Sequence, residues 1–184
     1  MLDIIPSTIA GVFAVTTGKI TDSRGSFARL FCDIELKKIL GDRSIHQINL
    51  SRTAARGAVR GLHFQYAPFG EMKFVRCLRG RVLDVAVDLR AGSPTIMAWH
   101  GEELSADNGR MLVIPEGCAH GFQVLEPDSE ILYLHTAHYS ASSEGGVLFD
   151  DPQLGIDWPL PPSDISKRDR SFQRIAADFK GIQL

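Results

Sequence analysis

The stretch that indicates the fold most directly is Gly109-Arg-Met-Leu-Val-Ile-Pro115-Glu-Gly117-Cys-Ala-His120. The apolar run before the proline is typical of a buried strand. Proline and glycine two positions apart predict a tight turn, because proline fixes φ near the turn value and glycine accepts a positive φ. The chain then returns with His120. The spacing therefore predicts a strand, a turn and a second strand whose histidine lies inside a barrel.

The stretch Arg81-Val-Leu-Asp-Val-Ala-Val-Asp-Leu-Arg90 alternates with the period of a β-strand. One face of this strand carries Leu83, Val85, Val87 and Leu89, and the other carries Val82, Asp84, Ala86 and Asp88. Further strands are expected at a spacing of about ten residues, which is typical of all-β folds. They span residues 9–16, 44–51, 73–78, 95–100, 111–114, 120–125 and 130–139.

Helical signals are few. Residues 33–40 begin with an acidic cap and precede Gly41, which predicts one short helix. Residues 152–164 are rich in proline and glycine and are expected to form an extended arm on the surface, followed by a short helix in the last dozen residues. The sequence thus predicts an all-β protein with short peripheral helices.

Length and charge limit the possible functions. The chain has 184 residues, which suits a single domain over residues 1–184, and its 44% hydrophobic content predicts a folded protein. A net charge of -2 argues against a nucleic-acid partner, which needs a basic excess. No apolar run approaches the roughly 20 residues of a membrane helix, and the N-terminus lacks the basic flank of a signal peptide. We therefore expect a soluble, cytoplasmic protein without a membrane partner, whose three cysteines are free thiols.

Residues 109–120 resemble the second signature of the cupin family. Its first signature supplies a His-x-His and a glutamate that bind a divalent metal together with the later histidine. Here Gln65 stands in place of the second histidine, and Lys73 in place of the glutamate. An amide and an ammonium cannot replace an imidazole and a carboxylate, so we expect no metal and no other cofactor. A fixed charge at Lys73 can instead stabilise an oxyanion.

Longer stretches resemble the dTDP-4-dehydrorhamnose 3,5-epimerase family along nearly the whole chain. They are Asp22-Ser-Arg24-Gly-Ser-Phe27, residues 56–65, 73–94 and 114–122, Asp151-Pro-Gln-Leu-Gly-Ile-Asp-Trp-Pro159, and Ser166-Lys-Arg-Asp169. The resemblance implies a cupin-type double-stranded β-helix, or jelly-roll, barrel, with N-terminal strands and a C-terminal arm or helix packed on it. It also implies a homodimer that binds a nucleotide-diphospho-4-keto-6-deoxy sugar and epimerises it at carbon 3, carbon 5 or both, in deoxysugar biosynthesis.

The chemistry of such an enzyme can be stated independently. The ketone at carbon 4 acidifies the hydrogens on carbons 3 and 5, so inversion needs a base on one face, stabilisation of the enolate, and an acid on the other face. The resemblance makes His63 the base and Asp169 the carboxylate that orients it. It makes Tyr133, which shares a strand face with His135 and Tyr139, the acid. Lys73 is the residue that stabilises the enolate or binds the sugar, and Asp84 either tunes the local charge or is structural.

Substrate-binding residues are also implied by the resemblance. Arg24 and Arg60 are expected to hold the diphosphate, whose geometry suits guanidinium groups, and Tyr139 to stack on the nucleotide base. The remaining substrate-binding positions are Phe27, Arg29, Gln47, Asn49, His120, Glu144 and Arg168.

Several positions depart from the family pattern. Arg29 stands where a glutamate is usual, Ile48 where an aspartate is usual, and Arg168 where a lysine is usual. The usual Pro-x-x-Gln is replaced by Pro68-Phe-Gly-Glu-Met72. These changes predict the same proton chemistry with altered recognition of the nucleotide or sugar. If residue 29 is solvated, recognition is unchanged.

Three alternatives remain open at this point. One is an epimerase that inverts only carbon 3 or only carbon 5, or that uses a GDP- or CDP-sugar. Another is a sugar-binding cupin without activity, which the joint presence of His63, Tyr133, Lys73 and Asp169 argues against, because binding alone needs no opposed acid and base. The third is a metal-dependent cupin oxygenase, which Gln65 and Lys73 argue against.

Overall fold

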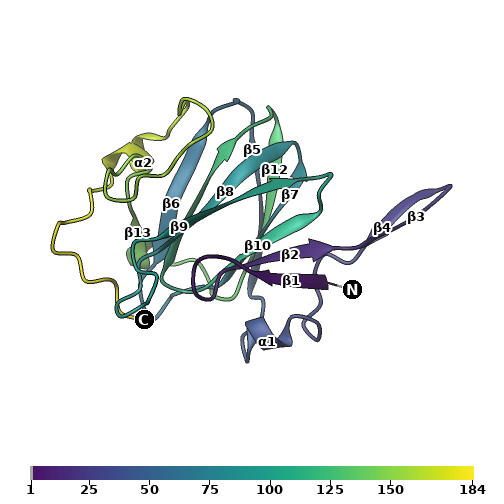
Figure 1. The fold of residues 1–184 in the computed structure, drawn as a ribbon, viewed down its shortest axis with the longest axis horizontal. Helices are drawn as coiled ribbons and strands as arrows, with labels where there is room; N and C mark the ends of the chain where they lie inside the picture. Colours follow the sequence, from purple (N-terminus) through teal and green to yellow (C-terminus); the bar gives the residue numbers. More distant parts are fainter. Residues whose placement is uncertain (1) are drawn as a thin grey trace.

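Two antiparallel β-sheets form the body of the computed structural model, which describes residues 2–184 (Figure 1). In sheet order, the six-stranded sheet consists of β1 (Leu2–Pro6), β2 (Phe13–Thr17), β10 (Arg110–Ile114), β7 (Lys73–Arg79), β12 (Ser129–His135) and β5 (Gln47–Thr53). The five-stranded sheet consists of β13 (Glu144–Gly146), β6 (Val59–Gln65), β11 (Cys118–Val124), β8 (Arg81–Asp88) and β9 (Trp99–Ser105). The prediction of an all-β fold is confirmed.

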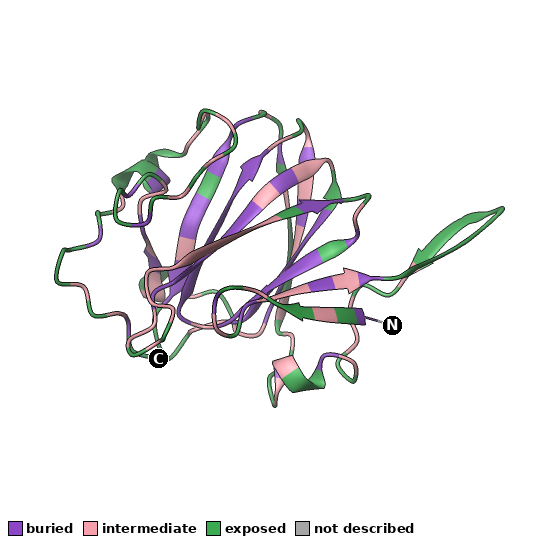
Figure 2. Cartoon of the chain, in the orientation of Figure 1, coloured by how far each residue is buried: buried purple, intermediate pink, exposed green. Residues whose placement is uncertain are grey.

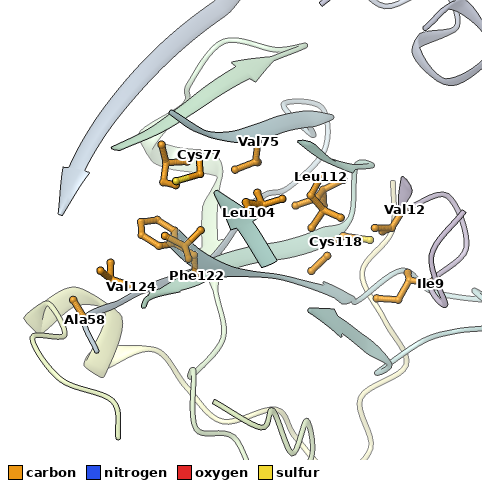
Figure 3. Close-up of a cluster of buried hydrophobic side chains, with 14 residues drawn as sticks. Ile9, Val12, Ala58, Val75, Cys77, Leu104, Leu112, Cys118, Phe122 and Val124 are labelled. Atoms are coloured by element: carbon orange, nitrogen blue, oxygen red, sulfur yellow. The ribbon is translucent and has the colours of Figure 1, made fainter. Parts of the chain in front are cut away.

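The two sheets meet in a buried apolar core (Figure 3). The six-stranded sheet contributes Val75 and Leu112 to this core, and the five-stranded sheet contributes Ala86 and Phe122. All four side chains are at most 1% exposed, so each supplies nearly its full burial energy, about 25 cal/mol per Å² of apolar surface. The core occupies part of the space between the sheets and leaves the rest for polar side chains.

Strand β8 shows the predicted alternation. Val82 and Ala86 point into the core between the sheets, together with the completely buried Asp84. Val85 and Val87 point outward into a second apolar cluster, which also contains residues of the C-terminal segment such as Leu154, Ile175 and Ile182. One strand therefore has two apolar faces, because the C-terminal segment covers the outer face of its sheet.

The turn predicted at Pro115 and Gly117 is present. Gly117 has φ 77°, and a Cβ at this position would lie 2.4 Å from the Cγ of Arg90, so only glycine fits. The turn links β10 to β11, and these strands belong to different sheets. It thereby carries the chain across the barrel and places His120 inside, where it is 5% exposed.

A separate hairpin projects from the body of the molecule (Figures 1 and 2). Its strands are β3 (Lys19–Asp22) and β4 (Gly25–Ala28), which pair only with each other among the described strands. Ile20 is 73% exposed and Phe27 is 67% exposed. Exposed apolar side chains on a projecting arm are typical of a surface that contacts another chain.

The helices are shorter than the sequence predicts. Residues 33–36 form a turn, and α1 covers only Lys37–Leu40, with Leu36 and Leu40 buried against the outer face of the six-stranded sheet. The remaining helical segments are η1 (Ala141–Ser143) and α2 (Lys167–Ser171). None of the helices within residues 2–184 is long and apolar enough to span a membrane.

Other predicted boundaries were wrong. The last dozen residues form no helix, because Ile175 and Ile182 are buried in the outer cluster and Ile182 exchanges backbone hydrogen bonds with residues 89–91. The strand expected over residues 95–100 begins only at Trp99, since the side chain of Thr95 bonds to Asp88 in a turn. The strands expected over residues 9–16 and 130–139 cover Phe13–Thr17 and Ser129–His135 instead.

Candidate active site

A cavity of about 280 Å³ opens between the two sheets. Strands β5, β7 and β12 form one wall, strands β6, β11 and β13 form the other, and α2 lies at the rim. It is lined by most of the predicted site residues, namely His63, Lys73, Tyr133, Asn49, Arg60, His120, Tyr139, Glu144 and Arg168. The fold thus brings together side chains that are more than 100 residues apart in the sequence.

A close approach of two backbones places the histidines. His63 on β6 lies opposite His120 on β11 in the strand register. Next to them, a Cβ on Gly61 would lie 2.5 Å from the Cα of Gly121, which is closer than real Cβ contacts. Glycine at position 61 therefore lets β6 and β11 approach each other where the cavity begins.

His63 and Asp169 form a hydrogen-bonded pair. The distance from His63 Nε2 to Asp169 Oδ1 is 2.8 Å. Asp169 lies on α2, and its backbone N–H donates a hydrogen bond to the side chain of the N-cap residue Ser166 at 3.0 Å. The Oδ2 atom of Asp169 accepts a further bond from Gly61 N–H at 3.2 Å. The strand and the short helix together fix the imidazole ring.

The carboxylate decides which nitrogen of His63 carries the proton. Burial acts to raise the pKa of Asp169, but the hydrogen bonds from His63 and Gly61 outweigh burial and lower it to about 2. The ionised carboxylate only accepts hydrogen bonds, so Nε2 carries the proton and donates it. Arg168 Nη2 lies 3.0 Å from the same nitrogen but is itself a donor. Nδ1 of neutral His63 is therefore the basic nitrogen.

Lys73 lies at the start of β7 and is 6% exposed. Its ammonium donates to the backbone oxygen of His63 at 3.2 Å and forms an ion pair with Glu71 Oε1 at 3.3 Å. Two of its three donors are thus engaged, and the side chain lines the same cavity as His63.

Tyr133 lies on β12, in the opposite sheet from His63. Its hydroxyl is 3.0 Å from that of Ser51, and its ring contacts those of His120 and His135 at centroid distances of 6.0 and 5.9 Å. Burial raises the pKa of Tyr133 to about 12, although the hydrogen bond with Ser51 acts in the other direction. The phenol is therefore protonated at neutral pH and holds a proton that it can donate.

His120 belongs to a second histidine–carboxylate pair. Its Nε2 is 2.7 Å from Asp84 Oδ1, and the side chains are 6% and 0% exposed. Complete burial raises the pKa of Asp84, against the opposing effect of His120. The other oxygen, Oδ2, is buried and has no hydrogen-bond partner among the described residues.

The rim of the cavity carries a smaller polar network. Glu144 accepts hydrogen bonds from Arg168 Nη1 at 3.0 and 3.1 Å and from the Tyr139 hydroxyl at 3.2 Å. The sequence predicted that Tyr139 shares a strand face with Tyr133 and His135. Strand β12 ends at His135, so Tyr139 reaches the cavity from the segment after the strand. Gln47 does not line the cavity, but its Oε1 accepts from the backbone of Tyr139 at 3.2 Å.

Besides Gln47, three predicted substrate-binding residues lie outside the cavity. Arg24 and Phe27 belong to the hairpin arm, where Arg24 is paired with Asp22 at 2.6 Å. Arg29 follows β4 and forms an ion pair with Glu35. Within residues 2–184 of one chain, these side chains do not meet the catalytic candidates.

Sequence reasoning did not assign Glu71 and His135 to the site, although both line the cavity. Glu71 Oε2 is 2.8 Å from His135 Nδ1. Two signals were available, since His135 shares the strand face of Tyr133 and Glu71 precedes Lys73 by two residues in the altered Pro68–Met72 segment. Their contact joins two strands that are far apart in the sequence, so spacing alone does not reveal it.

Gln65, which replaces the second cupin histidine, bonds to the backbone. Its amide donates to Phe69 O at 2.9 Å and His138 O at 3.2 Å, and its oxygen accepts from Ser140 N–H at 2.6 Å. In the part of the chain that the structure describes, no group of three or more His, Cys, Asp or Glu side chains stands close enough to hold a metal ion.

A jelly-roll barrel with these polar side chains in one cavity defines the class of cupin-type sugar epimerases. Residues 6–177 match the family model described as dTDP-4-dehydrorhamnose 3,5-epimerase. The chain belongs to this family, and it is therefore an isomerase that epimerises sugar nucleotides. Membership argues against the sugar-binding cupin without activity and against the metal-dependent oxygenase.

Similarity to individual proteins supports this assignment. The chain is 45% identical over 165 residues to the dTDP-4-dehydrorhamnose 3,5-epimerase of Sinorhizobium fredii, covering 89% of this chain and 85% of that protein. It is 39% identical over 172 residues to the dTDP-4-dehydrorhamnose 3-epimerase of Streptomyces niveus, covering 93% of this chain and 83% of that protein.

The fold is also that of solved relatives. The Legionella pneumophila dTDP-6-deoxy-D-glucose-3,5-epimerase, in complex with dTDP-4-keto-L-rhamnose, superposes with a TM-score of 0.91 at 36% identity. The match covers 99% of this chain and 98% of that structure. The predictions of the cupin-type fold and of the epimerase family are confirmed.

Proposed function

We propose that the chain binds a dTDP-4-keto-6-deoxy sugar in the cavity between the sheets and inverts carbon 3, carbon 5 or both through an enolate, in deoxysugar biosynthesis. The observation that carries this proposal is the arrangement around one cavity: His63, bound by Asp169 of α2, lies on one sheet, and Lys73 and Tyr133 lie on the other. The relatives named above act on or bind dTDP-sugars, which supports the choice of nucleotide.

The proposed reaction begins with proton abstraction. Nδ1 of His63 removes the hydrogen from a carbon next to the ketone, and Asp169 stabilises the resulting imidazolium. The electron pair forms a carbon–carbon double bond, and the ketone oxygen becomes an enolate oxygen. Lys73 donates a hydrogen bond to this oxygen, an interaction that is stronger in the transition state than in the ground state.

Inversion is completed from the other face. Tyr133 gives its phenolic proton to the carbon from which the hydrogen was removed, and the electron pair returns to form the ketone. The tyrosinate then recovers a proton from solvent, with Ser51 as its hydrogen-bond partner, and His63 releases its proton. The reaction needs no cofactor, because protons are exchanged and nothing is oxidised or reduced.

Arg60 supports the assignment of the diphosphate site. It lines both the first cavity and a neighbouring groove of about 420 Å³, to which Arg52 and Arg168 also belong. We assign the sugar to the first cavity and the diphosphate to the boundary marked by Arg60, because guanidinium groups bind phosphate oxygens in a bidentate geometry. Asn49, His120 and Gln47 are assigned to sugar and rim contacts, and Tyr139 to the nucleotide base.

The hairpin arm supports a homodimer. Arg24 and Phe27 lie on an arm that contributes nothing to the cavity of its own chain, and the apolar Ile20 and Phe27 are exposed. We propose that the arm of one protomer reaches the site of its partner, and that residues 1–184 act as a single domain within this dimer. Mixing an inactive His63→Asn chain with an Arg24→Ala chain tests this, since activity should return only if the arm serves the partner's site.

Incubation with dTDP-4-keto-6-deoxyglucose in deuterium oxide tests the proposed reaction. Deuterium at carbons 3 and 5 supports double epimerisation, and deuterium at carbon 3 alone supports the second candidate, a 3-epimerase such as that of Streptomyces niveus. Folded wild-type protein that introduces no deuterium would contradict the proposal. Parallel incubation with the GDP- and CDP-linked sugars tests the nucleotide, for which Arg29 and Ile48 depart from the family pattern.

The three cysteines support the proposed compartment. Cys32, Cys77 and Cys118 are free, and burial raises the pKa of the Cys77 thiol to about 11 and that of Cys118 to about 12. Free thiols, two of which are buried with raised pKa values, suit a reducing environment. We therefore place the enzyme in the cytoplasm.

A further inference from the structure

A third histidine–carboxylate pair lies in the cavity, and the reaction described above leaves it without a role. Glu71 Oε2 accepts a hydrogen bond from His135 Nδ1 at 2.8 Å. The side chains are only 9% and 11% exposed. Glu71 stands two residues before Lys73, and β12 pairs with β7 so that His135 lies directly opposite Lys73. Both members of the pair are therefore neighbours of Lys73.

Glu71 makes contacts through both carboxylate oxygens. Oε2 is bound by His135, and Oε1 lies 3.3 Å from Lys73 Nζ. Burial acts to raise the pKa of Glu71, but the hydrogen bond from His135 and the charge of Lys73 outweigh burial and lower it. Glu71 is thus ionised at neutral pH and provides a buried counter-charge for Lys73.

The contacts of Lys73 define the direction in which it can act. An ammonium group has three N–H donors in a tetrahedral arrangement. One of them bonds to His63 O at 3.2 Å, and one points to Glu71. The third is left for the cavity, where the ketone oxygen of a bound sugar would lie. Without Glu71 the ammonium would lose one of its two contacts and could rotate away from this direction.

His135 is the second member of the pair and is held by contacts of its own. Its Nδ1 carries the proton donated to Glu71, so its Nε2 is the acceptor for the Asn49 amide at 3.4 Å. Its ring also packs nearly parallel to that of Tyr133, with an interplanar angle of 22°. His135 therefore fixes Glu71 from one side and supports the ring of Tyr133 on the other.

The remaining charged and titratable groups near Lys73 come from three other strands. Asp84 on β8 is close enough for the charge of Lys73 to lower its pKa, although burial raises it more. The side chain of His120 on β11 is hydrogen-bonded to Asp84. Strand β6 contributes the backbone oxygen of His63, which accepts a hydrogen bond from Lys73. Among residues 2–184, Glu71 is the carboxylate that forms an ion pair with Lys73.

We propose that Glu71, held by His135, is a positioning residue that supplies a buried counter-charge to Lys73 and aims its free N–H at the ketone oxygen of the substrate. This inference rests on the proposed role of Lys73 in stabilising the enolate. A neutral glutamine, which the family pattern predicts at this position, would accept a hydrogen bond but supply no counter-charge.

The test compares Glu71→Gln with wild type over a range of pH. We expect kcat to fall roughly ten- to a hundredfold, because a displaced group loses most of its effect on the transition state. KM should change by less than about threefold, since the hydrogen bond from Lys73 is stronger to the enolate oxygen than to the ketone oxygen of the bound substrate. The alkaline limb of kcat should move to lower pH, because the variant removes the carboxylate that forms an ion pair with Lys73.

Two further variants isolate the parts of the pair. His135→Phe keeps a ring to pack on Tyr133 but removes the donor to Glu71, so it should shift the alkaline limb in the same direction by a smaller amount. In the double variant of Glu71→Gln and His135→Phe, the combined effect should be smaller than the sum of the two single effects, since both act through Lys73. Glu116→Gln is the matched control, because it removes a carboxylate that pairs with Arg43 outside the cavity, and its pH profile should equal that of wild type.

Lys73→Met separates failure of this inference from failure of the proposed function. If Lys73→Met keeps wild-type turnover, the role of Lys73 itself is wrong, and the positioning role of Glu71 is wrong with it. If Lys73→Met is inactive while Glu71→Gln keeps the wild-type rate and pH profile, Lys73 acts as proposed and the role of Glu71 is overturned. Should Glu71→Gln fail to fold, an unchanged pH profile in His135→Phe overturns the inference equally.

Discussion

The His63–Asp169 and His120–Asp84 pairs are built from the same two residue types, and their histidines lie opposite each other on β6 and β11, yet their surroundings differ. The imidazole of His63 is 23% exposed at the cavity rim, whereas that of His120 is 6% exposed. Asp169 accepts additional hydrogen bonds from Gly61 N–H and Arg168 Nε, while Asp84 Oδ2 has no partner among residues 2–184.

This difference shifts the pKa values of the two carboxyl groups in opposite directions. The donors around Asp169 hold its pKa near 2 despite burial, and complete burial raises the pKa of Asp84 despite His120. The comparison teaches that a histidine beside a carboxylate does not define a general base. The balance between burial and the hydrogen bonds that the carboxylate accepts, from the histidine first and from backbone N–H second, decides whether it stays ionised and can stabilise an imidazolium. By this criterion we propose His63 for proton abstraction and His120 for substrate binding.

Replacement of the two histidines should separate their roles most clearly. We expect His63→Asn to lose at least about a hundredfold in turnover, since a general base contributes roughly 10² to 10⁴-fold. His120→Asn should retain more activity, with a larger effect on KM. Steady-state kinetics and deuterium incorporation measure both, and His46→Asn, an exposed histidine outside the cavity, is the control. Equal losses in both variants would remove the distinction between the pairs.

Tyr133→Phe should affect inversion but not proton abstraction. The variant removes the acid on the face opposite His63 and leaves the His63–Asp169 pair intact. We expect inversion to fall roughly ten- to a hundredfold while deuterium exchange into the substrate continues. Mass spectrometry of recovered substrate and NMR of the product give the two rates. If both rates fell together, proton abstraction would itself depend on Tyr133, and the assignment of separate acid and base would be wrong.

The stability of two asparagine variants tests the electrostatic comparison without reference to activity. Lowering the pKa of Asp169 from 3.8 to about 2 corresponds to about 2 kcal/mol of stability at pH 7, so Asp169→Asn should lose up to this amount. Asp84→Asn removes a buried carboxyl whose charged form is disfavoured, and it should change the free energy of unfolding by less than about 1 kcal/mol. Urea denaturation at pH 7 measures both. A larger loss for Asp84→Asn would reverse the comparison.

The sequence predicted the parts of the site that depend on short motifs. The alternation of residues 81–90 predicted β8, and the Pro115 and Gly117 spacing predicted a turn that places His120 inside the barrel. The resemblance supplied the residues that line the cavity, including His63, Lys73 and Tyr133. The predictions of the strand and of the turn succeeded because strand period and turn chemistry are local properties of the chain.

What the sequence did not predict depends on contacts between distant segments. The boundaries near residue 95 are set by the carboxylate of Asp88, and the C-terminal segment is held by an apolar cluster rather than by helix formation. Glu71 and His135 meet only because β12 pairs with β7. The hairpin arm pairs only with itself, so no partner within the described chain indicates where Arg24 and Phe27 act.

The pH dependence of stability gives the smallest and most specific test of the two pairs. Because the pKa of Asp169 is lowered in the folded state, its stabilisation is complete above the unfolded value near 3.8 and is lost as pH falls towards about 2. The difference between wild type and Asp169→Asn should therefore shrink over this range. The pKa of Asp84 is raised, so any stabilisation from its neutral form is present at low pH and is lost as pH rises through the folded-state value. Relative to wild type, Asp84→Asn should thus become more stable with increasing pH while Asp169→Asn becomes less stable. Parallel trends in the two variants would show that both carboxyl groups share one environment, which is contrary to the hydrogen bonds that distinguish them.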